Sequence, residues 1–182
     1  MRALIEAGAD VNQATNDGVT PLYIAARKGH EVIVWALMEL GADVNKAIDN
    51  GVTPLLIAVH QGKEAVVRAL IEAGADVNKA YDNGVTPLLC AAQKGHEAVV
   101  RALIEAGAEI DKARDDSVTP LYIAAENGHE TIVRALIEAG ADVNKATNNG
   151  WTPLAIATQE GHTAVVQILR DAVLVQMQHL YL

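Results

Sequence analysis

The sequence predicts an all-α repeat fold, a solenoid in which helix–turn–helix units stack on one another and hairpin loops project from them. Two observations predict this class. The phrase Thr-Pro-Leu begins at residues 20, 53, 86, 119 and 152, a constant spacing of 33 residues. Between these phrases a second one, close to Arg-Ala-Leu-Ile-Glu-Ala-Gly-Ala-Asp-Val-Asn, recurs at the same spacing. Periods of roughly 20 to 50 residues indicate stacked repeats.

The first helix of each unit is predicted to begin at the Thr-Pro pair. Thr53 is a good N-cap residue, and Pro54 suits the first helical position, where its missing N–H costs nothing. Leu55 and Val59 then lie at helical spacing and form one apolar face with the alanine between them. Gly62 is predicted to end this helix with a left-handed cap.

The second helix of the unit follows directly after this glycine. Glu64 is favourable at a helix start, and Val67 and Leu70 belong to an apolar stripe that stops at Gly74. Residues 75–84 then combine Asn, Asp and Gly, which predicts a turn or hairpin leading into the next Thr-Pro pair. The predicted order in each unit is hairpin, helix, turn, helix.

One array of these units accounts for the whole chain. A single unit cannot bury both of its apolar stripes, so we expect neighbouring units to stabilise one another by stacking. The predicted divisions of the array at 1–182 are a partial N-terminal repeat with a second helix only (1–14), internal repeats at 15–47, 48–80, 81–113 and 114–146, and a C-terminal capping repeat with an apolar tail (147–182).

Both ends of the array are predicted to expose apolar side chains. Leu4 and Ile5 lack one neighbouring unit, and the C-terminal tail has no Gly at position 173, so the last helix is expected to run on. Apolar residues at helical spacing along the tail are Val173, Leu174, Met177 and Leu180. The resulting hypothesis is a homo-oligomer formed through these ends.

The repeated phrases resemble those of the ankyrin repeat. The resemblance rests on Thr-Pro-Leu-x-x-Ala-Ala, the following Gly-His, and Gly-Ala-Asp-Val-Asn, which recur in phase over roughly residues 1–172. It implies antiparallel helix pairs stacked into a curved array, hairpin loops at about right angles to the helices, and a concave face that binds other proteins. The His that usually follows Thr-Pro-Leu is absent, and the residues in its place are Tyr23, Leu56, Leu89, Tyr122 and Ala155.

The charge balance argues against nucleic acid and membrane surfaces as partners. The chain has 14 basic and 23 acidic residues and a formal net charge of −9, which repels phosphate backbones and anionic lipid. No stretch approaches the length of a membrane span, and the N-terminus lacks the apolar run of a signal peptide. We therefore expect a soluble chain, cytoplasmic if natural, with no defined compartment if engineered.

The sequence predicts no enzyme, no bound metal and no cofactor. Cys90 is the single cysteine, which excludes an internal disulfide and a multi-cysteine metal site. No nucleophile motif, phosphate-binding Gly loop or metal-spaced His or Cys pair is present. One slot holds a histidine in four units, which indicates a role in the architecture; these are His30, His96, His129 and His162.

One unit departs from the others at its hairpin. Ser117 occupies the slot that holds Gly18, Gly51, Gly84 and Gly150 in the other units. If this slot requires a positive φ, the serine costs about 1 kcal/mol there.

Other slots change from unit to unit while the packing slots stay constant. They lie on the hairpin five residues before each Thr, directly after Thr-Pro-Leu, and before the Gly between the helices. Positions 56 and 60 are four residues apart and turned away from the apolar face, so these slots are predicted to line one exposed surface. With Trp151 of the last hairpin, the predicted protein-binding residues are Tyr23, Arg27, Lys28, Ile48, Leu56, His60, Tyr81, Leu89, Gln93, Lys94, Arg114, Tyr122, Glu126, Asn127, Trp151, Gln159 and Glu160.

Apolar and aromatic residues in these slots favour binding over neutral drift. Drift of exposed slots predicts mostly polar residues, whereas Ile48, Tyr81 and Tyr122 are large and apolar or aromatic, as recognition surfaces require. The predicted function is a non-catalytic protein–protein interaction scaffold. The alternative is an engineered or recently duplicated stable scaffold with no evolved target, because near-identical copies arise in either way.

The same surface carries a gradient of charge. Arg27, Lys28 and Lys94 lie toward its N-terminal half, and Glu126 and Glu160 lie toward its C-terminal half. Two interpretations follow: either the gradient steers a partner protein of opposite polarity, or it is a solvated mixture of no consequence.

Overall fold

The chain is a stack of paired helices, as the sequence predicts. The computed structural model describes residues 8–179, with side chains described through Val175. Leu4, Ile5, Leu180 and the side chain of Met177 therefore lie outside the described part. The helices within this range are α2 (Pro21–Lys28) with α3 (Glu31–Glu39), α4 (Pro54–His60) with α5 (Glu64–Glu72), α6 (Pro87–Lys94) with α7 (Glu97–Glu105), α8 (Pro120–Glu126) with α9 (Glu130–Glu138), and α10 (Pro153–Gln159) with α11 (Thr163–His179).

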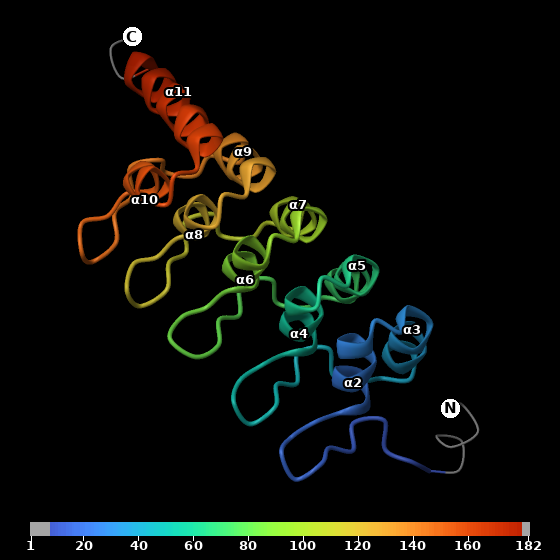
Figure 1. The fold of residues 1–182 in the computed structure, drawn as a ribbon. Helices are drawn as coiled ribbons and strands as arrows, with labels where there is room; N and C mark the ends of the chain where they lie inside the picture. Colours follow the sequence, from blue (N-terminus) through green and yellow to red (C-terminus); the bar gives the residue numbers. More distant parts are fainter. Residues whose placement is uncertain (1–7, 180–182) are drawn as a thin grey trace.

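The array has three layers, which Figure 1 shows side by side: projecting loops, first helices and second helices. First helices contact one another in chain order, α2 with α4, α4 with α6, α6 with α8 and α8 with α10. Second helices do the same from α3 to α11, and each first helix also contacts its own second helix. Equivalent slots of successive units therefore lie in rows along the array.

The Thr-Pro pairs start the first helices in the predicted way. Thr53 has extended backbone, and its Oγ1 accepts a hydrogen bond of 3.1 Å from the backbone N–H of Leu56. Pro54 follows at the start of the helix. The threonines Thr20, Thr86, Thr119 and Thr152 cap their helices in the same manner. This repeated cap fixes where each first helix begins.

The core runs without a break through the layers of first and second helices. Leu55 and Val59 of α4 are buried, and so are Val67 and Leu70 of α5. The same slots are buried in the neighbouring units, and together they form one apolar cluster. Burial of this kind is the main stabilising term, and here most of it depends on an adjacent unit.

The projecting segments are tight hairpin loops with almost no paired strand. In each loop a backbone N–H donates to the carbonyl four residues later, as from Ile48 to Val52 and from Tyr81 to Val85, both at 3.0 Å. Within residues 8–179 the bridge between Tyr81 and Val85 is the sole β-pairing. The expected β-hairpins are thus present as loops. Each reverses direction within five residues, which leaves no room for a longer run of paired strand.

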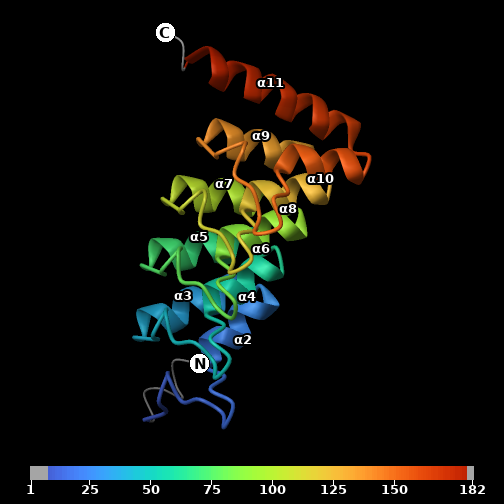
Figure 2. The ribbon, with the colours of Figure 1, turned by 90° about the vertical axis from the view of Figure 1, so that its left-hand side faces the viewer.

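The last helix extends past the point where the inner second helices end. α11 has 17 residues, compared with 9 in α5 or α7. Val173 occupies the slot of the helix-ending Gly74, so nothing stops the helix there. The predicted extension is confirmed, and Figure 2 shows α11 projecting beyond its neighbours.

Candidate protein-binding groove

The C-terminal ends of the first helices are exposed on the side of the loops. Arg27 and Lys28 of α2, His60 of α4 and Lys94 of α6 are all exposed, in line with the prediction for these slots. In the later units Gln93, Asn127, Gln159 and Glu160 are also exposed, while Glu126 is half-buried. We call these helix ends, together with the hairpin residues described next, the groove.

The hairpin slots of the groove differ in exposure. Ile48, Tyr81 and Arg114 are half-buried at the bases of their loops. Trp151 has 39% of its surface exposed at the last hairpin. These four residues therefore present part of their side chains to solvent beside the helix ends.

The prediction that the slot after Thr-Pro-Leu is exposed was wrong. The exposed fraction is 6% for Tyr23, 2% for Leu56, 0% for Leu89 and 8% for Tyr122. All four belong to the core or lie sealed against neighbouring helices, so they form little or no contact surface for a partner.

The burial of this slot follows from the packing of the first helices. In α4 the residues Leu55, Leu56, Ala58 and Val59 are all buried. A first helix contacts the first helix before it, the one after it and its own second helix, so its buried face is much wider than one i, i+3, i+4 stripe. Only the last turn, at His60, extends out of this packing.

The N-terminal half of the groove is electropositive. Burial raises the pKa of Tyr23, and nearby Arg27 partly opposes this. Burial lowers the pKa of His60, and the positive charge of Lys94 lowers it further, followed by that of His96. Among the ion pairs of the described residues, none involves Arg27, Lys28 or Lys94. These cations are therefore available to the carboxylates of a partner.

The C-terminal half of the groove is electronegative. Burial raises the pKa of Tyr122, and the charges of Glu126, Asp116 and Glu160 raise it further. Arg114 is neutralised within the chain, because its Nη2 lies 2.6 Å from Oδ2 of Asp116. The hydrogen bond from Arg114 lowers the pKa of Asp116. The predicted change of sign along the groove is thus present in the structure.

A cavity of about 150 Å³ opens on the groove between the second and third units. Its lining residues are Tyr23, Val52, Leu56, Ile57, His60, Gln61, Tyr81 and Cys90. Sequence reasoning missed Val52, Ile57 and Cys90 as groove residues, whereas Gln61 belongs to a slot that was predicted to line this surface. One signal was present: Cys90 is smaller than the isoleucine that fills the same slot in every other unit.

The recurring histidines join neighbouring units. Nε2 of His96 lies 3.3 Å from the carbonyl oxygen of His60, and Nε2 of His162 lies 2.9 Å from that of Glu126. A Cβ at Gly62, where φ is +64°, would stand 2.8 Å from the His96 ring. The rings of His96, His129 and His162 each pack on the glycine of the unit before, which explains why these units repeat the Gly-His pair. These histidines act in packing, as predicted.

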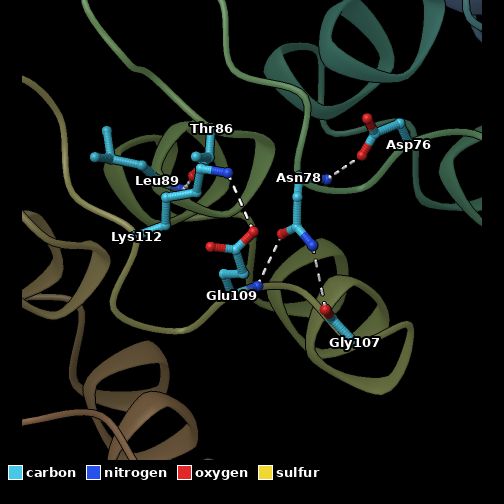
Figure 3. Close-up of polar contacts among 7 residues, drawn as sticks. All are labelled: Asp76, Asn78, Thr86, Leu89, Gly107, Glu109 and Lys112. Atoms are coloured by element: carbon cyan, nitrogen blue, oxygen red, sulfur yellow. Dashed lines mark hydrogen bonds and ion pairs between the residues drawn. The ribbon is translucent and has the colours of Figure 1, made fainter.

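The asparagines of Gly-Ala-Asp-Val-Asn form a second ladder between units. Figure 3 shows Asn78, whose Oδ1 accepts from the N–H of Glu109 at 2.8 Å and whose Nδ2 donates to the carbonyl of Gly107 at 3.4 Å. Asn45 makes the same two contacts with the unit that follows it. These side chains bind the scaffold and lie outside the groove.

The remaining features of the described residues point to no other kind of site. No group of three His, Cys, Asp or Glu side chains in this part of the chain is arranged to hold a metal ion. None of the described helices combines the length and the apolar character that a membrane crossing requires.

Comparison with known proteins gives the family. A protein-family model described as ankyrin repeats in three copies matches residues 1–48, 41–114 and 111–177. No curated protein matches the chain. The family matches agree with the paired helices, the capping threonines and the ladders between units described above. Because they span far more than half of the sequence, the chain belongs to the ankyrin repeat family.

Proposed function

We propose that this chain is a non-catalytic module that binds a partner protein in the groove between its hairpin loops and the ends of its first helices. Ankyrin repeats generally mediate protein–protein interaction and are generally non-catalytic. The proposal assigns this general role to one surface of this chain. Tyr23, Leu56, Leu89 and Tyr122 contribute little to this surface, since these side chains are almost fully buried.

One observation carries the proposal: the exposed slots on this surface hold a different residue in most units. The exposed second-helix slot of Val32, by contrast, holds only Val, Ala or Thr. The slot before the inter-helix glycine reads Lys28, Gln61, Lys94, Asn127 and Glu160, and each of these side chains is exposed or half-buried. The slots that join units are nearly constant, because substitutions there would break the stacking. The chain can therefore vary its groove without loss of stability.

A pair of charge-reversal variants tests this assignment. The chain is immobilised, proteins are captured from a cell extract, and the affinity of each captured protein is measured for the native chain and for two double variants. We expect Arg27→Glu with Lys94→Glu to weaken binding by about tenfold or more, since recognition residues of this kind often contribute over 1 kcal/mol.

The matched control changes the net charge by the same amount, but at residues on the second helices. Arg134→Glu with Arg170→Glu alters exposed residues of α9 and α11, away from the groove. We expect this double variant to bind as the native chain does. If the control variant loses binding and the groove variant does not, recognition lies on the second helices, and the proposal is refuted.

A second candidate function is self-association through the ends of the array. Leu174 and Val175 on the extended part of α11 have 59% and 52% of their surfaces exposed, and Val32 of α3 has 82% exposed. Exposed apolar groups of this kind favour contact between copies. Light scattering at high concentration should show oligomers that Leu174→Lys with Val175→Lys converts to monomers. If the native chain stays strictly monomeric, self-association is refuted. Partner binding and a stable scaffold without a target then remain as the two alternatives.

A further inference from the structure

The groove has one slot whose side chain is smaller than in every other unit. The fourth residue after the capping threonine is Ile24, Ile57, Ile123 and Ile156 in four units and Cys90 in the fifth. Cys90 lines the 150 Å³ cavity together with Leu56 and Ile57. The missing methyl groups therefore leave room where the other units are filled.

The neighbouring hairpin also leaves this cavity accessible. Three of the loops are tied to the loop before them by a backbone bond, namely Asp49 to Asp17 (3.3 Å), Asp115 to Asn83 (3.0 Å) and Asn148 to Asp116 (3.1 Å). In the described part of the chain no such bond ties the loop at 81–85 to the loop at 48–52. Tyr81 and Val52, from these two loops, both line the cavity.

The size and lining of the cavity suit one apolar side chain. A cavity of about this volume in a protein interior accepts a benzene-sized group. Val52, Leu56, Ile57 and Cys90 provide apolar walls, and no carboxylate lines the cavity. A leucine or phenylalanine side chain of a partner could displace water from these walls, which is the usual way in which an anchor residue contributes affinity.

Two cationic side chains lie near the cavity. Lys94 is close enough to Cys90 and His60 to act on both electrostatically, and Arg27 acts in the same way on Tyr23. Lys94 and Arg27 are exposed and, among the described ion pairs, have no partner. A partner carboxylate next to the anchor could thus approach them without breaking a pair inside the chain.

We propose that the cavity at Cys90 is an anchor pocket for a polypeptide segment that carries one leucine or phenylalanine next to acidic residues. This inference rests on the proposed binding function and specifies the chemistry of the partner. Apolar burial in the pocket supplies affinity, while Arg27 and Lys94 select carboxylates on either side of the anchor.

A displayed library of random twelve-residue peptides, selected on the immobilised chain, tests this proposal. We expect the enriched peptides to carry Leu or Phe with Asp or Glu within two residues. These peptides are then synthesised, and their affinities are measured by fluorescence anisotropy. Affinity should fall as salt is added, because exposed charges contribute to it.

Cys90→Ile is the decisive variant, since it introduces the residue that the same slot holds in the other four units. It fills the pocket with little change in the fold, and it should weaken binding by about tenfold or more. Lys94→Glu changes only an exposed residue and should weaken binding about fivefold. Cys90→Ala keeps the pocket open and should weaken binding less than Cys90→Ile does. The control Arg134→Glu, on α9, should bind as the native chain does.

The outcomes separate this inference from the proposed function. Selection that enriches no peptide, or only basic peptides, overturns the anchor pocket. The anchor pocket is also overturned if peptides bind Cys90→Ile and Lys94→Glu as tightly as the native chain but lose affinity for Trp151→Ala or Glu160→Lys. In that case the groove keeps its binding role. Peptides lost only in Arg134→Glu overturn the pocket and the groove together.

Discussion

Ser117 shows how a single residue can work against the repeat. Its φ is +66°, positive like the φ of the glycines that hold this slot elsewhere, such as Gly84 at +82°. The slot does require a positive φ, which costs a non-glycine residue about 1 kcal/mol. The Ser117 hydroxyl donates a 2.6 Å hydrogen bond to Oδ1 of Asn148, which offsets part of this cost.

Ser117→Gly should therefore stabilise the chain. The hydrogen bond to Asn148 lies at the surface and contributes little, so the net gain in the free energy of unfolding should be about 0.5 kcal/mol. Urea unfolding measures it. The reverse change, Gly84→Ser, serves as the control and should destabilise. A lower stability for Ser117→Gly would mean that the hydrogen bond outweighs the strain.

Cys90 makes the stability depend on pH in the alkaline range. Burial raises the pKa of its thiol from the ordinary 9.0 to about 11. A raised pKa in the folded state means that the contribution is complete below pH 9 and is lost as the pH rises toward 11. Relative to Cys90→Ala, the native chain should lose on the order of 2 kcal/mol by pH 11.

Urea unfolding of both chains from pH 8 to pH 11 provides this comparison. The tyrosines and lysines are the same in the two chains, so their titration cancels in the difference. A difference that stays constant across the range would show that the Cys90 thiol ionises as freely in the folded chain as in the unfolded one.

At the scale of elements, the asparagine ladder has one altered rung. Asp111 occupies the slot of Asn78, and its carboxylate accepts from the N–H of Asp142 at 3.1 Å. A carboxylate cannot donate to the carbonyl of Gly140, whereas Asn78 donates to that of Gly107. The contact between these two units thus lacks a hydrogen bond that the units before it have.

Asp111→Asn should restore this bond and stabilise the chain by about 0.5 to 1 kcal/mol. Asn78→Asp is the reciprocal variant and should destabilise by a similar amount. Asn144→Asp is the matched control, because α11 continues where the next unit would supply a partner, and it should change little. Thermal unfolding of the three variants measures these changes in stability. If Asn144→Asp destabilises the chain as much as Asn78→Asp does, the contacts between units are not the source of the effect.

At the scale of the whole molecule, stability is distributed over contacts between neighbours. In the described part of the chain each helix contacts its own partner helix and helices of adjacent units, and these are the extensive helix–helix contacts there. Solenoids of this kind gain or lose units without change of architecture.

Deletion of residues 81–113 removes one unit and keeps the phase of the rest. We expect the shortened chain to remain helical by circular dichroism and to unfold cooperatively, with an m-value lower by about a fifth, because less surface is exposed on unfolding. A deletion of residues 88–107 breaks the phase and should abolish cooperative unfolding. Equal behaviour of the two deletions would contradict stacking as the source of stability.

The sequence predicted the scaffold more completely than the groove. Features that depend on local backbone effects followed from residue identity. These are the helix start at Thr53, the left-handed cap at Gly62 and the extension of the last helix through Val173. The burial of Leu56 and Leu89 did not, because it depends on neighbours that cover a helix on both sides. The pocket at Cys90 also required side-chain volumes and loop positions in three dimensions.

We propose that the groove, and no other face of the array, recognises a protein partner. The most direct measurement is an alanine scan of every exposed residue in the described part of the chain, read out as affinity for a partner captured on the native chain. We expect losses of about tenfold or more to gather on Arg27, Lys94, Trp151 and their neighbours in the groove. Losses concentrated on the outer faces of α5, α7 and α9 would contradict it.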